Sequence, residues 1–144
     1  MLIAFRDHAD ELEKEFDIEG GVIPMSFIIN NGDQDPAILM NGFGEGYGDT
    51  GDHFAVTDEG KVIYAPTQEG YKEGIEWLHK LVTEDLIDAE AFTQEWSTYV
   101  AKGKNHRYGL CFTWDIANID NNTDYVMLPA LTGPDGVRNI TRQN

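Results

Sequence analysis

Apolar residues recur at intervals of three and four along three stretches of the chain, which is the pattern of amphipathic helices. The first stretch lies within residues 1–16, the second within 67–82 and the third within 94–104. Each predicted helix is expected to bury one face and to expose its charged face to solvent. The expected inward positions are Leu2, Phe5, Ala9, Leu12 and Phe16 in the first helix, Tyr71, Ile75, Leu78 and Val82 in the second, and Trp96, Tyr99 and Val100 in the third.

Short apolar runs between these helices predict strands. Residues 22–29 form a buried run that Pro24 is expected to interrupt, and residues 53–66 predict a hairpin that turns at Asp58-Glu59-Gly60. Residues 108–110 predict another buried strand, and so do residues 125–131. Helices and strands that alternate in this way indicate an α/β fold.

The charge of the chain narrows the range of partners. Its 144 residues include 26 acidic and 10 basic ones, which gives a formal charge of −16. Such a charge repels the phosphates of nucleic acids and of anionic membranes, so we expect no nucleic-acid partner. The single cysteine, Cys111, cannot form an internal disulfide, and no apolar stretch has the length of a membrane-spanning helix.

Motifs of catalytic and metal sites give no positive case for an enzyme. Alternating glycines at 42–48 match neither a dinucleotide fingerprint nor a phosphate-binding loop. An EF-hand counted from Asn31 lacks the required glycine and glutamate, whereas a looser calcium site at Asp49 and Asp52 stays open. We therefore predict no catalytic activity, no cofactor and no metal.

A tryptophan and an aspartate follow the predicted strand at 108–110 side by side, in the sequence "CFTWD". Proteins bind sugars with flat aromatic faces and with carboxylates or amides that hydrogen-bond to the hydroxyl groups. Trp114 and Asp115 fit this chemistry. Trp114 could equally be a core residue, with Asp115 capping a helix at "IANI", and the two interpretations are compatible.

The stretch at 60–104 resembles a known family. It contains a Gly-Lys-Val strand that ends in Ala-Pro, a Tyr-Lys-Glu-Gly helix that leads to Leu-Ile-Asp, and then Glu-Ala-Phe-Thr-Gln and Ala-Lys-Gly. In these motifs, in Trp114-Asp115 and in "GPDG" at 133–136, the chain resembles the family 1 extracellular solute-binding proteins of bacterial ABC importers, in their lipoprotein branch. The segment "HADELEKEFDIEGG" departs from the acidic segment of that family, so no metal role is carried over.

The resemblance implies an α/β fold of the periplasmic-binding-protein type II, in which two lobes close on a ligand. Members of the family are much longer, so residues 1–144 are expected to form a single partial lobe, truncated at both ends, with a flexible tail at 133–144. The predicted helix at 1–16 has neither an N-cap nor a secretion signal before it, which agrees with an internal piece of a longer protein.

The resemblance also implies a function, which is the capture of an extracellular solute and its delivery to membrane permease subunits. In this branch of the family the expected solute is an oligosaccharide. The parent protein would be lipid-anchored at the extracellular face of the membrane, and apolar surface left by the missing lobe could produce a dimer. The expected ligand-binding residues are Trp114, Asp115, Phe43, Tyr47 and Trp96. A glycan-active hydrolase domain and a calcium-dependent adhesion module are the alternatives.

Overall fold

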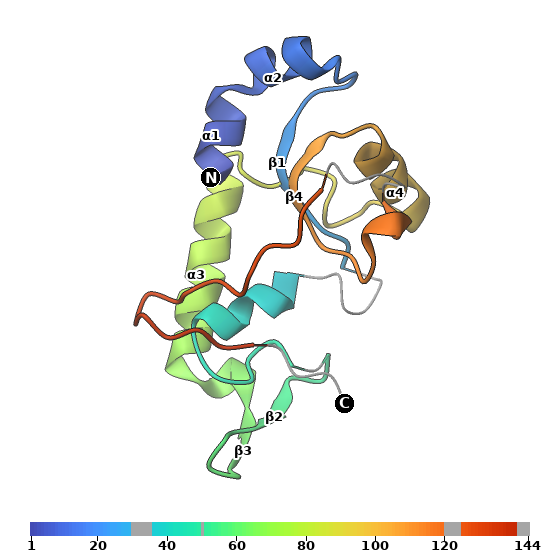
Figure 1. Ribbon diagram of the computed structural model, residues 1–144. Coiled ribbons are helices and arrows are strands. Elements are labelled where there is room, and N and C mark those ends of the chain that lie inside the picture. The colour runs from blue at the N-terminus through green and yellow to red at the C-terminus, as the bar shows by residue number, and fades with distance from the viewer. Residues whose placement is uncertain (30–35, 50, 120–124, 141–144) are drawn as a thin grey trace. The chain divides into compact units, whose positions relative to one another are not determined.

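The structure is a computed structural model that describes residues 1–29, 36–49, 51–119 and 125–140. The chain divides into two compact units, whose elements are labelled in Figure 1. Unit 1 consists of Met1–Asp35 and Leu81–Val126, and unit 2 consists of Pro36–Lys80 and Met127–Asn144. Both units combine helices with short strands, as expected of an α/β chain.

Unit 1 contains two parallel strands, β1 (Ile23–Ser26) and β4 (Tyr108–Cys111), whose register pairs Ile23 with Tyr108. All four residues of β1 are buried. The strand runs through Pro24 and is not interrupted there, contrary to the sequence prediction. Among the described residues β1 pairs only with β4, so the other edge of the strand accommodates a proline that has no N–H to donate.

The N-terminal helix is broken into two. The sequence predicts one helix over residues 1–16, but α1 (Leu2–Asp7) ends at His8 and α2 (Ala9–Phe16) begins after it. The α1 segment packs on both strands of unit 1 (Figure 1), and the Phe5 ring lies directly against Gly109 in β4. These tertiary contacts fix the direction of α1, which the spacing of apolar residues cannot predict.

The core of unit 1 forms around β4 and the helix α4 (Trp96–Lys104). Tyr99 of α4 is fully buried, and Trp96 and Cys111 pack on the same cluster while remaining partly exposed. The buried members of the cluster are Ile23, Ile28, Tyr99, Tyr108 and Ile119.

Unit 2 contains the 3₁₀ helices η1 (Pro36–Gly42) and η2 (Ala65–Thr67), the hairpin of β2 (Phe54–Val56) and β3 (Val62–Tyr64), and most of α3 (Glu69–Thr83). The hairpin is antiparallel, as predicted from its sequence. Its turn contains Gly60 with a φ of +77°, a conformation that glycine adopts without strain.

The buried face of α3 differs from the predicted one. Ile75 and Val82 are exposed by 47% and 41%, although their spacing predicted inward positions. The closest approach to η1 and the loop after it is made by Gly70 and Gly74, where a Cβ atom would meet the Phe43 carbonyl and the Met40 sulfur. Because glycine has no side chain, the side of α3 that carries Gly70 and Gly74 can pack closely against these groups. This side is therefore the inward face of the helix.

The apolar run at 125–131 is irregular and is not a strand, so this prediction is wrong. Val126 and Met127 are exposed by 79% and 80%. An apolar run forms a strand only beside a partner with free backbone groups. The run pairs with no strand among the described residues.

The flexibility predicted for 133–144 stays a prediction, and residues 141–144 lie outside the described part of the chain. Within unit 2, the Gly133 amide donates to the Val137 carbonyl, and the Asn139 side chain donates to the Asn41 carbonyl over 2.9 Å.

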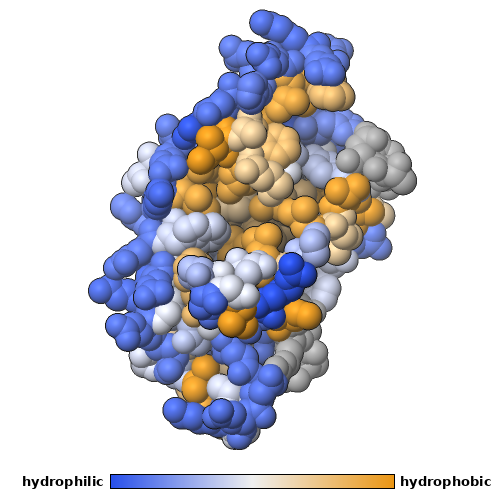
Figure 2. All heavy atoms as spheres, turned by 60° about the vertical axis from the view of Figure 1, so that its left-hand side comes forward, coloured by the Kyte–Doolittle hydropathy of each residue, from blue (hydrophilic) through white to orange (hydrophobic). Residues whose placement is uncertain are grey.

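One face of the hairpin is apolar and exposed. Figure 2 shows hydrophobic surface at the foot of the view, where the hairpin lies, with hydrophilic residues around it. The exposed side chains are Phe54, Val56, Val62 and Tyr64, which pair across the two strands, while Ala55 and Ile63 are buried on the other face. Within the described residues, no helix is long and apolar enough to span a membrane.

Candidate ligand-binding site

The segment that leaves β4 carries the tryptophan and the aspartate that the sequence analysis selects. Trp114 is exposed by 59%, although tryptophan side chains are highly buried on average in folded proteins. An indole with this exposure presents a flat apolar face to solvent, which suits the apolar face of a sugar ring.

Asp115 caps the short helix η3 (Ile116–Asn118), as the sequence predicts. Its Oδ1 accepts a hydrogen bond from the Ala117 amide over 2.9 Å, and its carbonyl accepts one from the Thr113 hydroxyl over 2.9 Å. The Asp115 side chain is exposed, so the cap leaves the carboxylate accessible to a ligand hydroxyl.

Trp96 lies in the same unit, at the edge of the aromatic core. Its ring centroid is 5.8 Å from that of Tyr99, which in turn is 5.2 Å from that of Tyr108. The Tyr99 hydroxyl hydrogen-bonds to the backbone of Phe112, two residues before Trp114. Trp96 is thus connected to the Trp114 segment through Tyr99, and its role as a ligand contact stays a prediction.

Phe43 and Tyr47 belong to unit 2, where both are half-buried against α3. Their ring centroids lie 5.7 Å from Trp77 and 6.0 Å from Tyr71, respectively. Both rings therefore contribute to packing within unit 2. Their predicted contact with a ligand stays a prediction.

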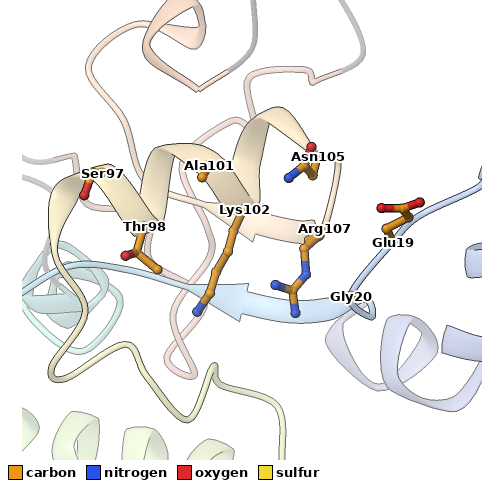
Figure 3. A pocket seen from close by; sticks show the side chains of 8 residues that line it. All are labelled: Glu19, Gly20, Ser97, Thr98, Ala101, Lys102, Asn105 and Arg107. Atoms are coloured by element: carbon orange, nitrogen blue, oxygen red, sulfur yellow. The ribbon is translucent and has the colours of Figure 1, made fainter.

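A hollow of about 550 Å³ lies on unit 1 between α4 and the chain that enters β1 (Figure 3). Two of its basic side chains are already engaged, because Arg107 donates to the Gly21 carbonyl and Lys102 binds Asp88. No aromatic ring lines it, so it lacks the flat surface on which sugars stack. Its lining residues are Glu19, Gly20, Ser97, Thr98, Ala101, Lys102, Asn105 and Arg107.

A buried ion pair joins three segments of unit 1. Lys102 Nζ lies 2.8 Å from Asp88 Oδ2, and the two side chains are 8% and 6% exposed. Ser26 Oγ donates to the same carboxylate oxygen over 2.8 Å, and Gln94 connects Ser26 with Lys102. Glu90 Oε2 also pairs with the ammonium group over 2.7 Å. The sequence pattern did not predict this pair. Its one signal is that Lys102 lies three residues after the inward-facing Tyr99 and so on the same side of α4.

Burial determines the protonation of the groups behind the Trp114 segment. It raises the pKa of the Cys111 thiol to about 12, against a smaller opposing effect of a hydrogen bond with Tyr99. It likewise raises the pKa values of Tyr99 and Tyr108 above their ordinary range. At neutral pH these groups are therefore protonated, and Cys111 has little thiolate character.

Acidic and histidine side chains in the described ranges form no cluster that could hold a metal ion. Asp49 Oδ1 accepts from the Asn41 amide group over 3.4 Å, and Asp52 Oδ1 accepts from the Phe54 amide over 3.3 Å. Residues 31–35, the first part of the stretch compared with an EF-hand loop, lie outside the described residues.

No protein-family model matches the chain. It is 41% identical over 127 residues to the fructooligosaccharide ABC transporter substrate-binding protein FusA of Streptococcus pneumoniae serotype 4. The match covers 88% of this chain and 23% of FusA. The chain therefore spans about a quarter of the length of this relative.

Two solved structures share the fold. One is a FusA EF-hand mutant in complex with fructo-nystose, with a TM-score of 0.85, and the other is FusA in complex with kestose, with a TM-score of 0.84. Each is 37% identical in sequence, and each match covers 98% of this chain and 28% of the solved one. The predicted resemblance and the predicted α/β fold are confirmed. Over the part of their length that it spans, the chain is similar in sequence and in fold to the substrate-binding proteins of ABC transporters.

Proposed function

We propose that this chain is part of the substrate-binding component of an ABC importer that captures an oligosaccharide. The observation that carries the proposal is the similarity to FusA, which combines 41% sequence identity with a TM-score of 0.85. The solved FusA proteins bind kestose and fructo-nystose. Short fructooligosaccharides are therefore the first ligands to test.

Trp114 and Asp115 are the proposed centre of the ligand contact in this chain. The exposed indole would stack on the apolar face of a sugar ring, and the carboxylate would accept hydrogen bonds from sugar hydroxyls. Trp96, Phe43 and Tyr47 are proposed as further contacts, because each is an aromatic residue that is only half-buried.

The proposed context is a longer protein at the extracellular face of the membrane, lipid-anchored and working with permease subunits. In that protein, closure of two lobes around the ligand would produce the shape that the transporter recognises. The relatives are binding proteins, and we propose binding without catalysis for this chain as well.

A titration of the chain with kestose tests this proposal. Saturation-transfer NMR detects the roughly millimolar affinity (about −4 kcal/mol) that we expect from part of a site. Trp114→Ala should abolish the signal, whereas Tyr64→Ala, which removes an exposed aromatic ring of the hairpin, should retain it. Asp115→Asn should weaken binding and preserve the fold, because asparagine is also a good N-cap residue.

A chimera provides a stronger form of the test. This chain would replace the matching quarter of FusA, and kestose binding would be measured by calorimetry. The chimera would be compared with its Trp114→Ala variant. Equal kestose affinities of the two folded proteins would contradict the proposal. Hydrolysis of kestose would favour the glycan-active alternative, and loss of binding with a calcium chelator would favour the adhesion module.

We also propose that copies of the chain associate weakly through the exposed face of the hairpin. Val62 is 66% exposed and lies opposite Val56 on that face. Burying such a face stabilises a dimer, while the charge of −16 opposes it. Sedimentation velocity at high salt should show a dimer that Val62→Lys eliminates.

A further inference from the structure

The Tyr99 hydroxyl holds a peptide segment that lies outside the strand. Tyr99 is fully buried in α4, and its hydroxyl accepts a hydrogen bond from the Phe112 amide over 2.9 Å. The same hydroxyl donates to the Phe112 carbonyl over 2.8 Å. Phe112 is the first residue after β4, so Tyr99 partners both backbone groups where the strand ends.

The position of this hydroxyl is fixed by the core of unit 1. The Tyr99 ring lies between those of Trp96 and Tyr108, at centroid distances of 5.8 and 5.2 Å. The Tyr108 hydroxyl donates to the Tyr99 carbonyl over 2.9 Å. Burial also raises the pKa of Tyr99, so its hydroxyl keeps the proton that it donates to Phe112.

The segment is held from its other end as well. The Thr113 hydroxyl donates to the Asp115 carbonyl, and Asp115 Oδ1 accepts from the Ala117 amide, each over 2.9 Å. Trp114 lies between these two anchored points and remains 59% exposed. An exposed side chain on a constrained backbone loses less conformational entropy when it binds a ligand.

We infer that Tyr99 is a positioning residue for ligand binding, which sets the backbone from which Trp114 and Asp115 project. This inference rests on the proposed function, since it assigns these two residues to the ligand. Tyr99 itself would not touch the ligand, because it is fully buried.

The test is the variant Tyr99→Phe, which removes the hydroxyl and keeps the ring. We expect the Kd for kestose to rise about three- to tenfold, the scale of one or two lost hydrogen bonds. Labelling with 5-fluorotryptophan gives each of the three tryptophans its own resonance, and that of Trp114, assigned with Trp114→Phe, should shift or broaden.

The matched control is Tyr125→Phe, which removes the hydroxyl of another tyrosine that packs on the same cluster and donates to the Gly103 carbonyl. It should leave both the Kd for kestose and the Trp114 resonance unchanged. Equal loss of affinity in the two variants would overturn the inference, because it would indicate a general effect of the core.

The outcomes also separate this inference from the proposed function. If Trp114→Ala weakens kestose binding and Tyr99→Phe does not, the inference is wrong and the proposed function stands. If Trp114→Ala has no effect, the proposed site itself is wrong.

If Tyr99→Phe does not fold, hydrogen exchange of the unaltered protein tests the inference instead. The Phe112 amide should then exchange as slowly as the amides of β4, although it lies beyond the strand. Exchange at the rate of an unprotected amide would overturn the inference.

Discussion

At the scale of single residues, the buried pair of Lys102 and Asp88 is the most consequential feature for stability. The two charged groups lie 2.8 Å apart and are almost inaccessible to water. Asp88 also accepts from the Ser26 hydroxyl, and its own amide donates to the Met25 carbonyl in β1. One carboxylate therefore connects α4 and β1 with the segment that precedes α4.

The substitution Lys102→Met is expected to lower the free energy of unfolding by about 3 to 5 kcal/mol, because it leaves a buried carboxylate without its cation. Urea denaturation at pH 7 measures this loss. The control is Lys72→Met, since Lys72 is exposed and its ion pair with Glu76 should contribute less than about 0.5 kcal/mol. Similar stability in both variants would show that water reaches Asp88.

The same pair predicts a dependence on pH. Burial alone would raise the pKa of Asp88, but hydrogen bonds from Lys102, the Glu90 amide and Ser26 outweigh it and lower the pKa below its ordinary value of 3.8. The stabilisation is therefore present above pH 3.8 and is lost as the pH falls through the lowered pKa.

In Lys102→Met the remaining effect of burial should raise the pKa of Asp88, so the variant becomes more stable as the carboxylate gains a proton. The difference in unfolding free energy between wild type and variant should therefore shrink as the pH is lowered from 7 toward 3. A constant difference across this range would contradict the role given to the Asp88 charge.

Some of these residues could be predicted from the sequence and others could not. Trp114 and Asp115 stand out because they follow an apolar strand, and the Asp115 cap follows from residue type alone. The partnership of Lys102 with Asp88 could not be predicted, since charged residues on a helix are normally solvated and nothing in the pattern brings the two segments together.

At the scale of elements, the inward face of α3 depends on two glycines. A Cβ atom at Gly70 would collide with the Phe43 carbonyl, which belongs to the backbone and cannot easily move. A Cβ atom at Gly74 would lie 2.7 Å from the Met40 sulfur, which is part of a flexible side chain. The two positions therefore respond differently to the same substitution.

Gly70→Ala is expected to destabilise unit 2 by about 1 to 3 kcal/mol, despite the higher helix propensity of alanine. Gly74→Ala should cost less, because the Met40 side chain can adjust. Gly51→Ala is the control, since an added Cβ there meets no atom within 4 Å. Thermal denaturation of the three variants should give this order, and a stabilising Gly70→Ala would contradict the close approach.

The elements that could be predicted are those with strong local signals. The hairpin has a glycine turn between two β-prone runs, and β4 is a short apolar run after a helix stop. The wrong predictions at 1–16 and 125–131 share a cause, because spacing and hydropathy contain no information about tertiary partners. In α3, the spacing of apolar side chains does not reveal the buried face, because glycines lie on it.

At the scale of the whole molecule, the α/β class and the relationship to ABC transporter proteins could be predicted, the first from alternation of elements and the second from the motifs at 60–104. The prediction of a single partial lobe over 1–144 stays a prediction. The division into two units could not be derived from the sequence, because each unit combines segments that are distant along the chain.

The parallel pairing of β1 with β4 predicts an order of folding. Residues 27–107 lie between the two strands, whereas β2 and β3 are joined by a short turn. Long-range pairing loses more loop-closure entropy and forms later. Pulse-labelled hydrogen exchange during refolding should protect the amides of 54–64 before those of 108–111, and the reverse order would contradict this.

The same pairing has a consequence for synthesis on the ribosome. At about 5 to 20 residues per second, β1 emerges on the order of ten seconds before β4 is complete. During that interval the apolar side chains of β1, among them Met25, have no strand partner, while a hairpin needs only microseconds to form. The nascent chain thus presents an unpaired apolar strand to chaperones at just the stage when its central hairpin is already folded.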